Sequence, residues 1–232
     1  MKYLIPPSEG KSKVISQDVL FSHTNFKFTQ QVNQVVRLLS LIEDEGLSAV
    51  YGTSEEKAMI FHRQNQDIFN SKCAYAIERY TGVVYEHLNW ETLNKTSQDF
   101  LQDHVYIFSG LFGMVSPKTL IPDYKLKMNV LSLQYHWNPI LTEELKKEDS
   151  IIDLLPQVHR KAYNKGSNVI TIDFQVIKKG KKSAAGHFGK AVKGQFIRYI
   201  AENKIKNIDD FAGFEYSGFK WDGKAFVKED NG

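Results

Sequence analysis

The sequence predicts an α+β fold, or an α/β fold with irregular order, in which a mixed sheet is flanked by helices. Residues 2–7, "KYLIPP", and residues 105–110, "VYIFSG", are short apolar runs that end in turn residues, as buried strands do. Gln30 to Glu45 places its apolar side chains on one helical face, and we expect Gly46 to stop this helix. Residues 47–64, "LSAVYGTSEEKAMIFHRQ", combine a hydrophobic lead-in, a turn-like Gly-Thr-Ser and a second helical run.

Two further strand regions follow in the second half of the chain. The β-branched run "VITIDFQVI" and the glycine turn in "KKGKK" predict a strand pair at residues 169–176 and 183–187. Residues 213–228, "GFEYSGFKWDGKAFVK", alternate aromatic and polar side chains around Ser-Gly and Asp-Gly, which is typical of a terminal hairpin. No repeat or linker divides the chain, so we expect a single compact domain over residues 1–232.

Composition limits the functional classes. The single cysteine, Cys73, excludes an internal disulfide framework and a thiolate zinc site, and it fits a reducing compartment. No apolar run approaches the roughly 20 residues of a membrane span. The start "MKYLIPPSEG" meets prolines too early for a signal peptide, so we expect a cytoplasmic protein with no membrane association. The net charge of +3 is too small to indicate a nucleic-acid partner by itself.

Basic residues are concentrated in one segment. Between Gln175 and Ile200 there are seven lysines and arginines and no acidic residue. The four lysines of "KKGKK" are typical of the solvated tip of a hairpin. Lys190 and Lys193, in contrast, lie on a predicted helix, beside its apolar stripe. Lysines in that position can line the edge of a cleft.

The turn after Tyr51 has two interpretations. A DNA-binding hairpin needs a hydrophobic anchor, a glycine-bearing turn and a second helix whose first amides face a phosphate. Gly52, Ser54 and Lys57 stand at about the glycine, glycine and lysine positions of such motifs, with serine in place of the second glycine. Ser54 could instead cap an ordinary helix, and Glu55 and Glu56 in its first turn would repel a phosphate.

The N-terminal "IPPSEGKS" is a second candidate for ligand contacts. It is not a phosphate-binding P-loop, because that motif needs a glycine where Ile5 stands. A turn directly after a strand is still a common place for ligand contacts, so Lys11 is a candidate anion contact and Glu9 a weak candidate base. No two histidines have the spacing of metal ligands on one helix, and we expect neither a metal nor a cofactor.

Several collinear motifs resemble the YaaA family, also called DUF328 or UPF0246, of peroxide-stress proteins. The most specific is the run Ser109 to Gly113, followed by Pro117 and the block Ile121 to Met128. Similar segments extend over nearly the whole chain: "LIPPSEGK", "RYTGVVYE", "HW" at residues 136–137, "HFGKAVKGQFIRYI" and "FAGFEYSGF". "DLLPQVHRKAYN" departs from the better-known branch of the family, as does Ser-Glu-Gly-Lys after the first strand.

The resemblance implies a cytoplasmic protein that limits oxidative damage to DNA, with a YaaA-like fold, a helix-hairpin-helix and a positively charged cleft implicated in DNA binding. The family-like residues that are hard to explain as core are four lysines and two tyrosines. They are Lys11, Tyr80, Tyr124, Lys127, Lys190 and Lys193. Lysines neutralise phosphates and tyrosine faces stack on bases, so we expect a cleft for a nucleic-acid backbone or a flipped nucleotide.

Two functions from different classes remain open at this point. The first is a DNA-binding protein that holds duplex or damaged DNA by backbone contacts without catalysis. The second is an enzyme that acts on a nucleobase or nucleoside, such as a glycosylase-like hydrolase, with a small nucleotide-like ligand in the same cleft. Direct peroxide sensing by Cys73 is a weaker alternative, because only Lys72 supplies a cationic neighbour in sequence.

Overall fold

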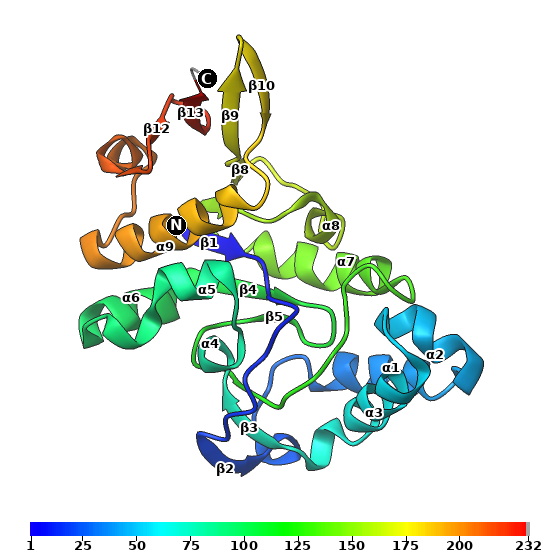
Figure 1. Cartoon of the computed structure of the whole chain (residues 1–232). Helices are drawn as coiled ribbons and strands as arrows, with labels where there is room; N and C mark the ends of the chain where they lie inside the picture. Colours follow the sequence, from blue (N-terminus) through cyan, green and yellow to red (C-terminus); the bar gives the residue numbers. More distant parts are fainter. Residues whose placement is uncertain (231–232) are drawn as a thin grey trace.

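The computed structural model, which describes residues 1–230, places the strands in three sheets (Figure 1). The central sheet has the order β5-β4-β1-β7-β8, and β1 pairs in parallel with both β4 and β7. Its strands are β1 (Lys2–Ile5), β4 (Val105–Ser109), β5 (Gly113–Val115), β7 (Ile151–Asp153) and β8 (Val169–Thr171). The α+β class and the first two predicted strands are confirmed, although the strands do not form one mixed sheet.

The C-terminal sheet has the order β10-β9-β13-β12-β11. Its strands are β9 (Phe174–Lys178), β10 (Lys181–Ala184), β11 (Glu215–Tyr216), β12 (Phe219–Trp221) and β13 (Phe226–Asp230). A hairpin at "KKGKK" is confirmed, with Lys179 and Gly180 at its left-handed tip. Its strands are residues 174–178 and 181–184 rather than 169–176 and 183–187, because residues 169–171 form β8 of the central sheet instead. The terminal region contains two successive turns, and β13 pairs in parallel with β9.

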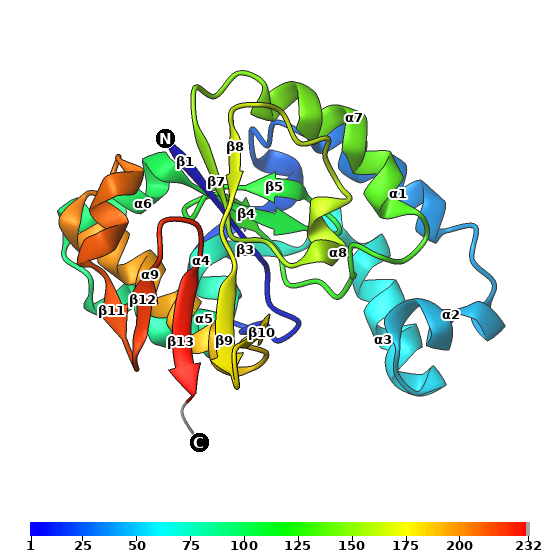
Figure 2. The ribbon, with the colours of Figure 1, turned by 90° about the horizontal axis from the view of Figure 1, so that it is seen from above.

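Helices surround the central sheet, as the view from above makes plain (Figure 2). They are α1 (Thr29–Leu39), α2 (Asp44–Tyr51), α3 (Glu55–Gln66), α4 (Ala76–Arg79), α5 (Val83–Leu88), α6 (Lys95–His104), α7 (Leu133–Leu145), α8 (Gln157–Arg160) and α9 (Phe188–Asn203). Four short 3-10 helices are η1 (Phe21–His23), η2 (Ile68–Asn70), η3 (Trp90–Thr92) and η4 (Ile208–Gly213). A third, small sheet joins β2 (Gln17–Leu20), β3 (Lys72–Tyr75) and β6 (Leu120–Ile121).

The first long helix ends earlier than the sequence predicts. The amide of Ser40 binds the carbonyl of Val36, and the next two amides bind carbonyls three residues back, which closes a tight final turn. Gly46 lies inside α2 instead, so the prediction that it stops the first helix is wrong. Helices α2 and α3 are joined through Gly52, which has φ of 63°, and lie at the opposite end of the molecule from the C-terminal sheet (Figure 1).

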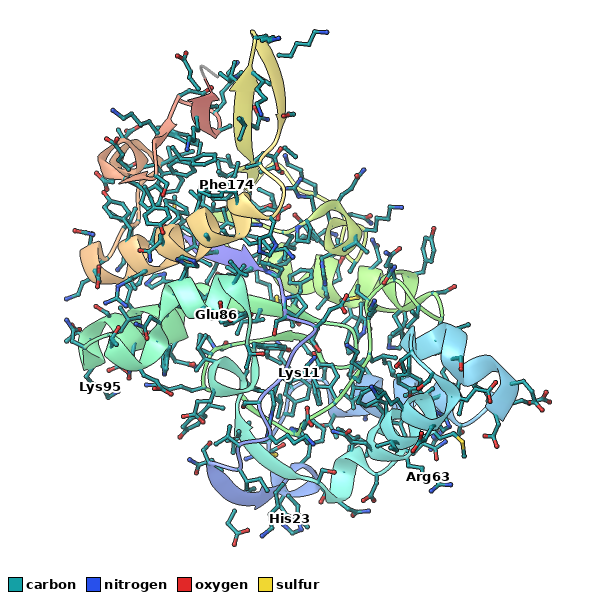
Figure 3. All side chains as sticks on the ribbon, viewed as in Figure 1. Lys11, His23, Arg63, Glu86, Lys95 and Phe174 are labelled. Atoms are coloured by element: carbon teal, nitrogen blue, oxygen red, sulfur yellow. The ribbon has the colours of Figure 1, made fainter. Side chains whose placement is uncertain are left out.

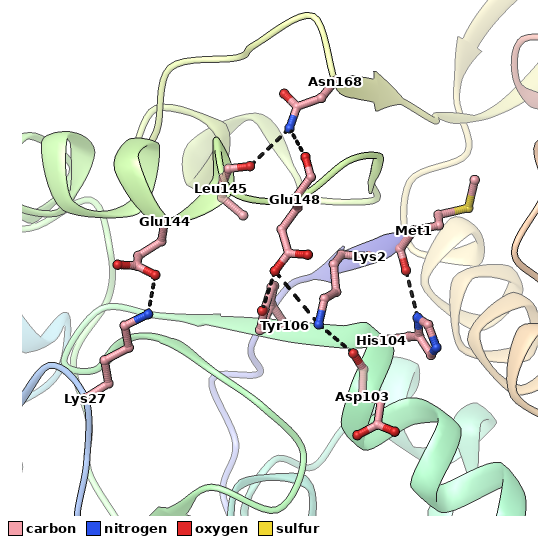
Figure 4. Close-up of polar contacts among 10 residues, drawn as sticks. All are labelled: Met1, Lys2, Lys27, Asp103, His104, Tyr106, Glu144, Leu145, Glu148 and Asn168. Atoms are coloured by element: carbon pink, nitrogen blue, oxygen red, sulfur yellow. Dashed lines mark hydrogen bonds and ion pairs between the residues drawn. The ribbon is translucent and has the colours of Figure 1, made fainter.

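Polar contacts fix the amino end of β1 (Figure 4). The Lys2 ammonium donates to the Asp103 carbonyl at 2.6 Å and lies 3.8 Å from the Glu148 carboxylate. That carboxylate accepts from the Tyr106 hydroxyl at 2.7 Å, and His104 donates to the Met1 carbonyl at 2.8 Å. The polar groups at this end of the sheet therefore form hydrogen bonds and ion pairs with one another.

Helices α5 and α9 lie side by side because Gly194 leaves no side chain between them (Figure 1). A Cβ atom at this position would come within 2.3 Å of the Val84 carbonyl oxygen and 2.7 Å of the His87 Cβ. Backbone and Cβ atoms cannot move aside as the end of a flexible side chain does. Close packing thus explains the glycine in the "GKAVKG" motif.

We expect Gly194→Ala to lower the free energy of unfolding by roughly 2 kcal/mol, because the added methyl group must push the two helices apart. Urea denaturation measures this loss. The neighbouring change Gln195→Ala removes a half-buried side chain from the same helix, and we expect it to alter stability by less than about 0.5 kcal/mol. Equal losses in the two variants would contradict this account of the helix contact.

Candidate functional site

The carboxyl ends of the parallel strands meet at one edge of the central sheet. Because β1 lies between β4 and β7, the loop that follows Ile5 emerges between the loops that follow Ser109 and Asp153. This is the edge at which open α/β sheets place their ligands. Two adjoining hollows open there, and we call them the large pocket and the small pocket.

The large pocket has a volume of about 960 Å³. Its walls come from the loop after β1, the segment after β7, the start of β9, strand β10 and the first turns of α9, and its lining includes Glu9, Tyr85, His159, Arg160, Lys190 and Lys193. The small pocket, of about 120 Å³, is lined by Lys11, Gly110, Tyr124 and residues 125–129. Residues 7–9, 158 and 159 form a wall common to both pockets.

Lys11 lies in the middle of the molecule (Figure 3). Its Nζ is 4.2 Å from the centre of the Tyr124 ring and 5.5 Å from that of the Tyr80 ring, and it donates to the Ser8 carbonyl at 3.1 Å. Burial, reinforced by the nearby Lys125 cation, lowers the pKa of Lys11 to about 7. The fold thus brings together three predicted site residues, and Lys11 is a desolvated amine rather than a surface cation.

The two tyrosines have a different role from the one expected. Both residues are buried, with only 2% of each exposed. The two hydroxyls are 2.9 Å apart, and that of Tyr124 lies 2.7 Å from the Ser109 hydroxyl. The expectation that Tyr80 and Tyr124 stack on bases is therefore wrong, because neither ring has a free face. They form the floor under Lys11.

Glu9 connects the pockets to the turn between α2 and α3. Its carboxylate is 3.1 Å from the Lys127 ammonium and 3.7 Å from that of Lys125. The hydrogen bond from Lys127 lowers the pKa of Glu9, which weakens it as a base. A Cβ built on Gly52 would be 3.9 Å from the Lys127 Nζ, so the turn lies directly beside this ion-pair group.

The other predicted residues of the turn do not line either pocket. Ser54 has the backbone conformation of a residue that begins a helix, but its hydroxyl accepts no hydrogen bond from the amides of α3. Lys57 is exposed in the first turn of that helix. Gly52, Ser54 and Lys57 thus form a surface next to the small pocket, separate from Lys190 and Lys193.

Lys193 projects from α9 into the large pocket. Its ammonium donates to the Leu154 carbonyl and lies 5.7 Å from the centre of the Phe174 ring. Burial lowers the pKa of Lys193 to about 8, and the neighbouring Arg160 guanidinium acts in the same direction. Lys190, one turn earlier on α9, is exposed at the rim of the same pocket.

The sequence analysis missed a charged network at the end of β7. The buried Asp153 carboxylate accepts from Arg160 Nε at 3.0 Å, from the Tyr163 hydroxyl at 2.8 Å and from the Leu155 amide at 2.7 Å. Arg160 also donates to Asp173 at 3.0 Å. In the sequence, Asp153 ends a short apolar run and is followed by Leu-Leu-Pro. The apolar run of β1 is likewise followed by proline, and this similarity could have indicated the site.

His159 belongs to the wall shared by the two pockets. Burial lowers the pKa of its imidazole to about 4, and the nearby Lys193 cation contributes to the shift. Its buried Nδ1 has no hydrogen-bond partner within residues 1–230. His159 is therefore a neutral polar group at neutral pH, placed where a ligand could contact it.

Comparison with known proteins identifies the family. A sequence model described as "Peroxide stress protein YaaA" matches residues 1–225. The chain belongs to this YaaA family. Similar proteins, each described as a UPF0246 protein, occur in Flavobacterium johnsoniae, Francisella tularensis subsp. novicida and Lactobacillus helveticus, with identities of 29%, 28% and 27%. The aligned regions cover 96%, 95% and 93% of this chain and 95%, 94% and 91% of those proteins.

Several of the motifs that carry the YaaA resemblance line the two pockets. The Ser-Gly-Leu-Phe-Gly run begins at Ser109, the last residue of β4. Gly110 has no room for a side chain, because a Cβ would lie 2.6 Å from the Leu126 carbonyl oxygen. The block from Ile121 to Met128 supplies most of one wall of the small pocket, and the "GKAVKG" motif supplies Lys190 and Lys193. The YaaA motifs therefore account for the geometry of this edge.

The part of the chain that the structure describes contains no candidate for a reactive cysteine, a metal site or a membrane-spanning helix. Cys73 is fully buried in β3, and burial raises the pKa of its thiol to about 11, which is the reverse of a reactive thiolate. No cluster of metal-binding side chains occurs among residues 1–230. Across the same residues, every helix is too short or too polar to cross a membrane.

The buried Lys11 amine predicts a pH-dependent stability. Below about pH 7 the amine is charged in the folded and the unfolded chain, and its burial lowers the free energy of unfolding. Between pH 7 and the ordinary value of 10.5 the unfolded chain binds the extra proton, so stability rises with pH.

We expect Lys11→Met to be more stable than the parent protein at pH 6, with the difference shrinking by up to about 1.4 kcal/mol per pH unit above pH 7. Denaturant unfolding of both proteins from pH 6 to pH 10 measures it. Two stability profiles that stay parallel over this range would show that Lys11 is not a desolvated amine.

Proposed function

We propose that this YaaA-family protein is a cytoplasmic DNA-binding protein of the peroxide response, which holds duplex or damaged DNA at the turn between α2 and α3 and along the adjoining pockets. The observation that carries the proposal is the position of Gly52 beside Lys127. The turn lies beside Lys127, and Lys125 and Lys127 line the small pocket, which shares a wall with the large pocket. A DNA backbone held at the turn could therefore extend toward the pockets.

Backbone amides support the use of this turn as a helix-hairpin-helix. The first amide of α3 that binds within the helix is that of Ala58, which donates to the Ser54 carbonyl. The amides of residues 55–57 have no recorded partner among residues 1–230, and Ser54 does not cap them. Leu47 and Val50 are buried and anchor the turn. Free amides at a helix start bind phosphate oxygens without reading base sequence.

Charge alone does not explain binding at this surface. Lys57, Lys125 and Lys127 are accompanied by three glutamates, Glu9, Glu55 and Glu56. Local charge is therefore balanced, and the amides must supply the phosphate contact. Binding of this kind depends on the conformation of the turn more than on the number of lysines.

We expect Gly52→Val to weaken binding to a 20-base-pair duplex by about tenfold or more, since a β-branched residue does not tolerate a φ of 63° and turns the amides away from the phosphate. Fluorescence anisotropy at fixed salt concentration measures the affinity. Circular dichroism melting measures any accompanying loss of stability, which the exposed position of Gly52 should keep small.

Gly223→Val is the matched control. Gly223 has φ of 92°, has open space around it, lies in the turn between β12 and β13 and lines neither pocket. The control should show a similar backbone strain with unchanged DNA affinity. If both variants lost affinity equally, or if the parent protein bound no duplex, the proposed use of the hairpin would be rejected.

The large pocket favours a second candidate, an enzyme that acts on a nucleobase or nucleoside. A hollow of about 960 Å³ at the carboxyl ends of parallel strands is large enough for a nucleoside, and it is lined by polar groups of several kinds. Glu9 is the predicted base, although its ion pair with Lys127 opposes that role.

Incubation with free nucleosides, followed by chromatography of the products, tests the enzymatic candidate. We expect any turnover that depends on Glu9 to fall by about a hundredfold in Glu9→Gln, because an amide cannot accept the proton. Turnover that is unchanged in this variant would remove Glu9 from the chemistry, and the absence of any product would favour binding alone.

A further inference from the structure

We propose that Lys193 is an amine nucleophile that forms an imine with an aldehyde carrying a phosphate group, such as the ring-opened sugar of an abasic site. The identification of DNA as the source of this aldehyde rests on the proposed function. The amine chemistry itself rests on the large pocket and on the distribution of charges around Lys193.

Arg160 leaves Lys193 without an anionic partner. The two nearby carboxylates, Asp153 and Asp173, both accept hydrogen bonds from the guanidinium. Within residues 1–230 the recorded hydrogen bond of the Lys193 ammonium goes to the neutral Leu154 carbonyl, and no carboxylate is recorded within ion-pair distance. A lysine that is desolvated and lies beside another cation has the environment of a nucleophilic amine.

The pKa of about 8 agrees with this geometry. Near pH 7 roughly a tenth of the Lys193 side chains carry an unprotonated amine, whereas an ordinary lysine has far less than a hundredth in that form. The amine is also in contact with a hollow that can hold a substrate. Lys11, the other lysine with a strongly lowered pKa, lines a hollow of only about 120 Å³ and lies over two tyrosine rings.

Lys190 is placed to bind the phosphate group of the aldehyde. It lies three residues before Lys193 on α9, so the two side chains leave the same side of the helix. It is exposed at the pocket rim, and its ammonium has no recorded partner among residues 1–230. An aldehyde bound at Lys193 would thus have its phosphate about one helical turn away, near Lys190. Open-chain deoxyribose 5-phosphate, which carries its aldehyde and its phosphate at opposite ends of the carbon chain, fits this spacing.

The chemical step is a balanced condensation. The lone pair of the unprotonated Nζ attacks the aldehyde carbon, the C=O π bond breaks, and the oxygen takes up one of the two amine protons to give a neutral carbinolamine. This intermediate then loses its hydroxyl together with the remaining amine proton, so that one C=N bond and one water molecule form. No oxidant or reductant is consumed, and addition of water reverses the step.

Reductive trapping tests the proposal. The full-length protein is incubated with a duplex that contains one abasic site, and in parallel with free deoxyribose 5-phosphate, each in the presence of sodium cyanoborohydride. The reductant converts an imine into a stable secondary amine, which mass spectrometry locates. We expect the adduct on Lys193, and we expect Lys193→Arg to lower its yield by about tenfold or more, because arginine keeps the charge but cannot form the imine.

Two other variants make the result specific. Lys118 lines neither of the two pockets and pairs with Asp99 at 2.7 Å, and Lys118→Arg should leave the trapping yield within about twofold of the parent protein. Lys190→Gln should raise the concentration of deoxyribose 5-phosphate needed for half-maximal trapping by about fivefold, since a phosphate contact is lost.

The outcomes separate this inference from the proposed function. Binding to intact duplex without any adduct, or an adduct that persists in Lys193→Arg, would overturn the nucleophile and leave DNA binding intact. An adduct at Lys193 with deoxyribose 5-phosphate in a protein that binds no duplex would support the nucleophile and reject DNA as the source of the aldehyde.

Discussion

The parallel pairing of β1 with β4 on one side and β7 on the other is the constraint on which the site depends. Tyr3, Leu4 and Ile5 are fully buried, so β1 cannot shift its register without exposing its side chains or burying polar ones. Parallel strands direct their carboxyl ends to the same edge. The loop from Pro6 to Lys11 must therefore emerge between the segments that follow Ser109 and Asp153, and both pockets form where these three segments meet.

The two edges of the central sheet differ in how their polar groups are satisfied. At the amino end, Lys2 forms an ion pair with Glu148, and the Glu148 carboxylate also accepts a hydrogen bond from Tyr106 (Figure 4). At the carboxyl end, Lys11 and Lys193 are desolvated, and within residues 1–230 their hydrogen bonds go to backbone carbonyls. Burying an amine without a carboxylate opposes folding. Two such amines at one edge therefore lower the stability of the folded protein. Groups with strongly shifted pKa values are common at functional sites.

The sequence predicts the elements that border this edge, but not the contacts among the side chains within it. The strands β1 and β4 were predictable because each is an apolar run that ends in proline or glycine turn residues. Lys190 and Lys193 were predictable because helical spacing places them together. Strand β7 was missed because its three residues run directly into Leu154 and Leu155, so neither alternation nor a turn marks its end.

Contacts between distant segments account for most of the remaining misses. The burial of Tyr80 and Tyr124 depends on their hydroxyls meeting each other and Ser109, and a single sequence carries no sign of such a pairing. The same is true of Arg160, whose charge is taken up by two carboxylates from different segments. The DNA-binding use of the hairpin and the roles of the pocket residues remain predictions, because burial and distance describe a site without identifying its ligand.

The sealed position of Cys73 has a consequence for a member of a peroxide-stress family. Hydrogen peroxide attacks thiolates, and a thiol that is buried and has a pKa of about 11 offers almost none. Two of the four methionines, Met114 and Met128, are also buried. Cys73 is therefore a poor target for the oxidant. A thiol in this position stays reduced through an exposure that oxidises open thiols, and needs no reductase to restore it afterwards.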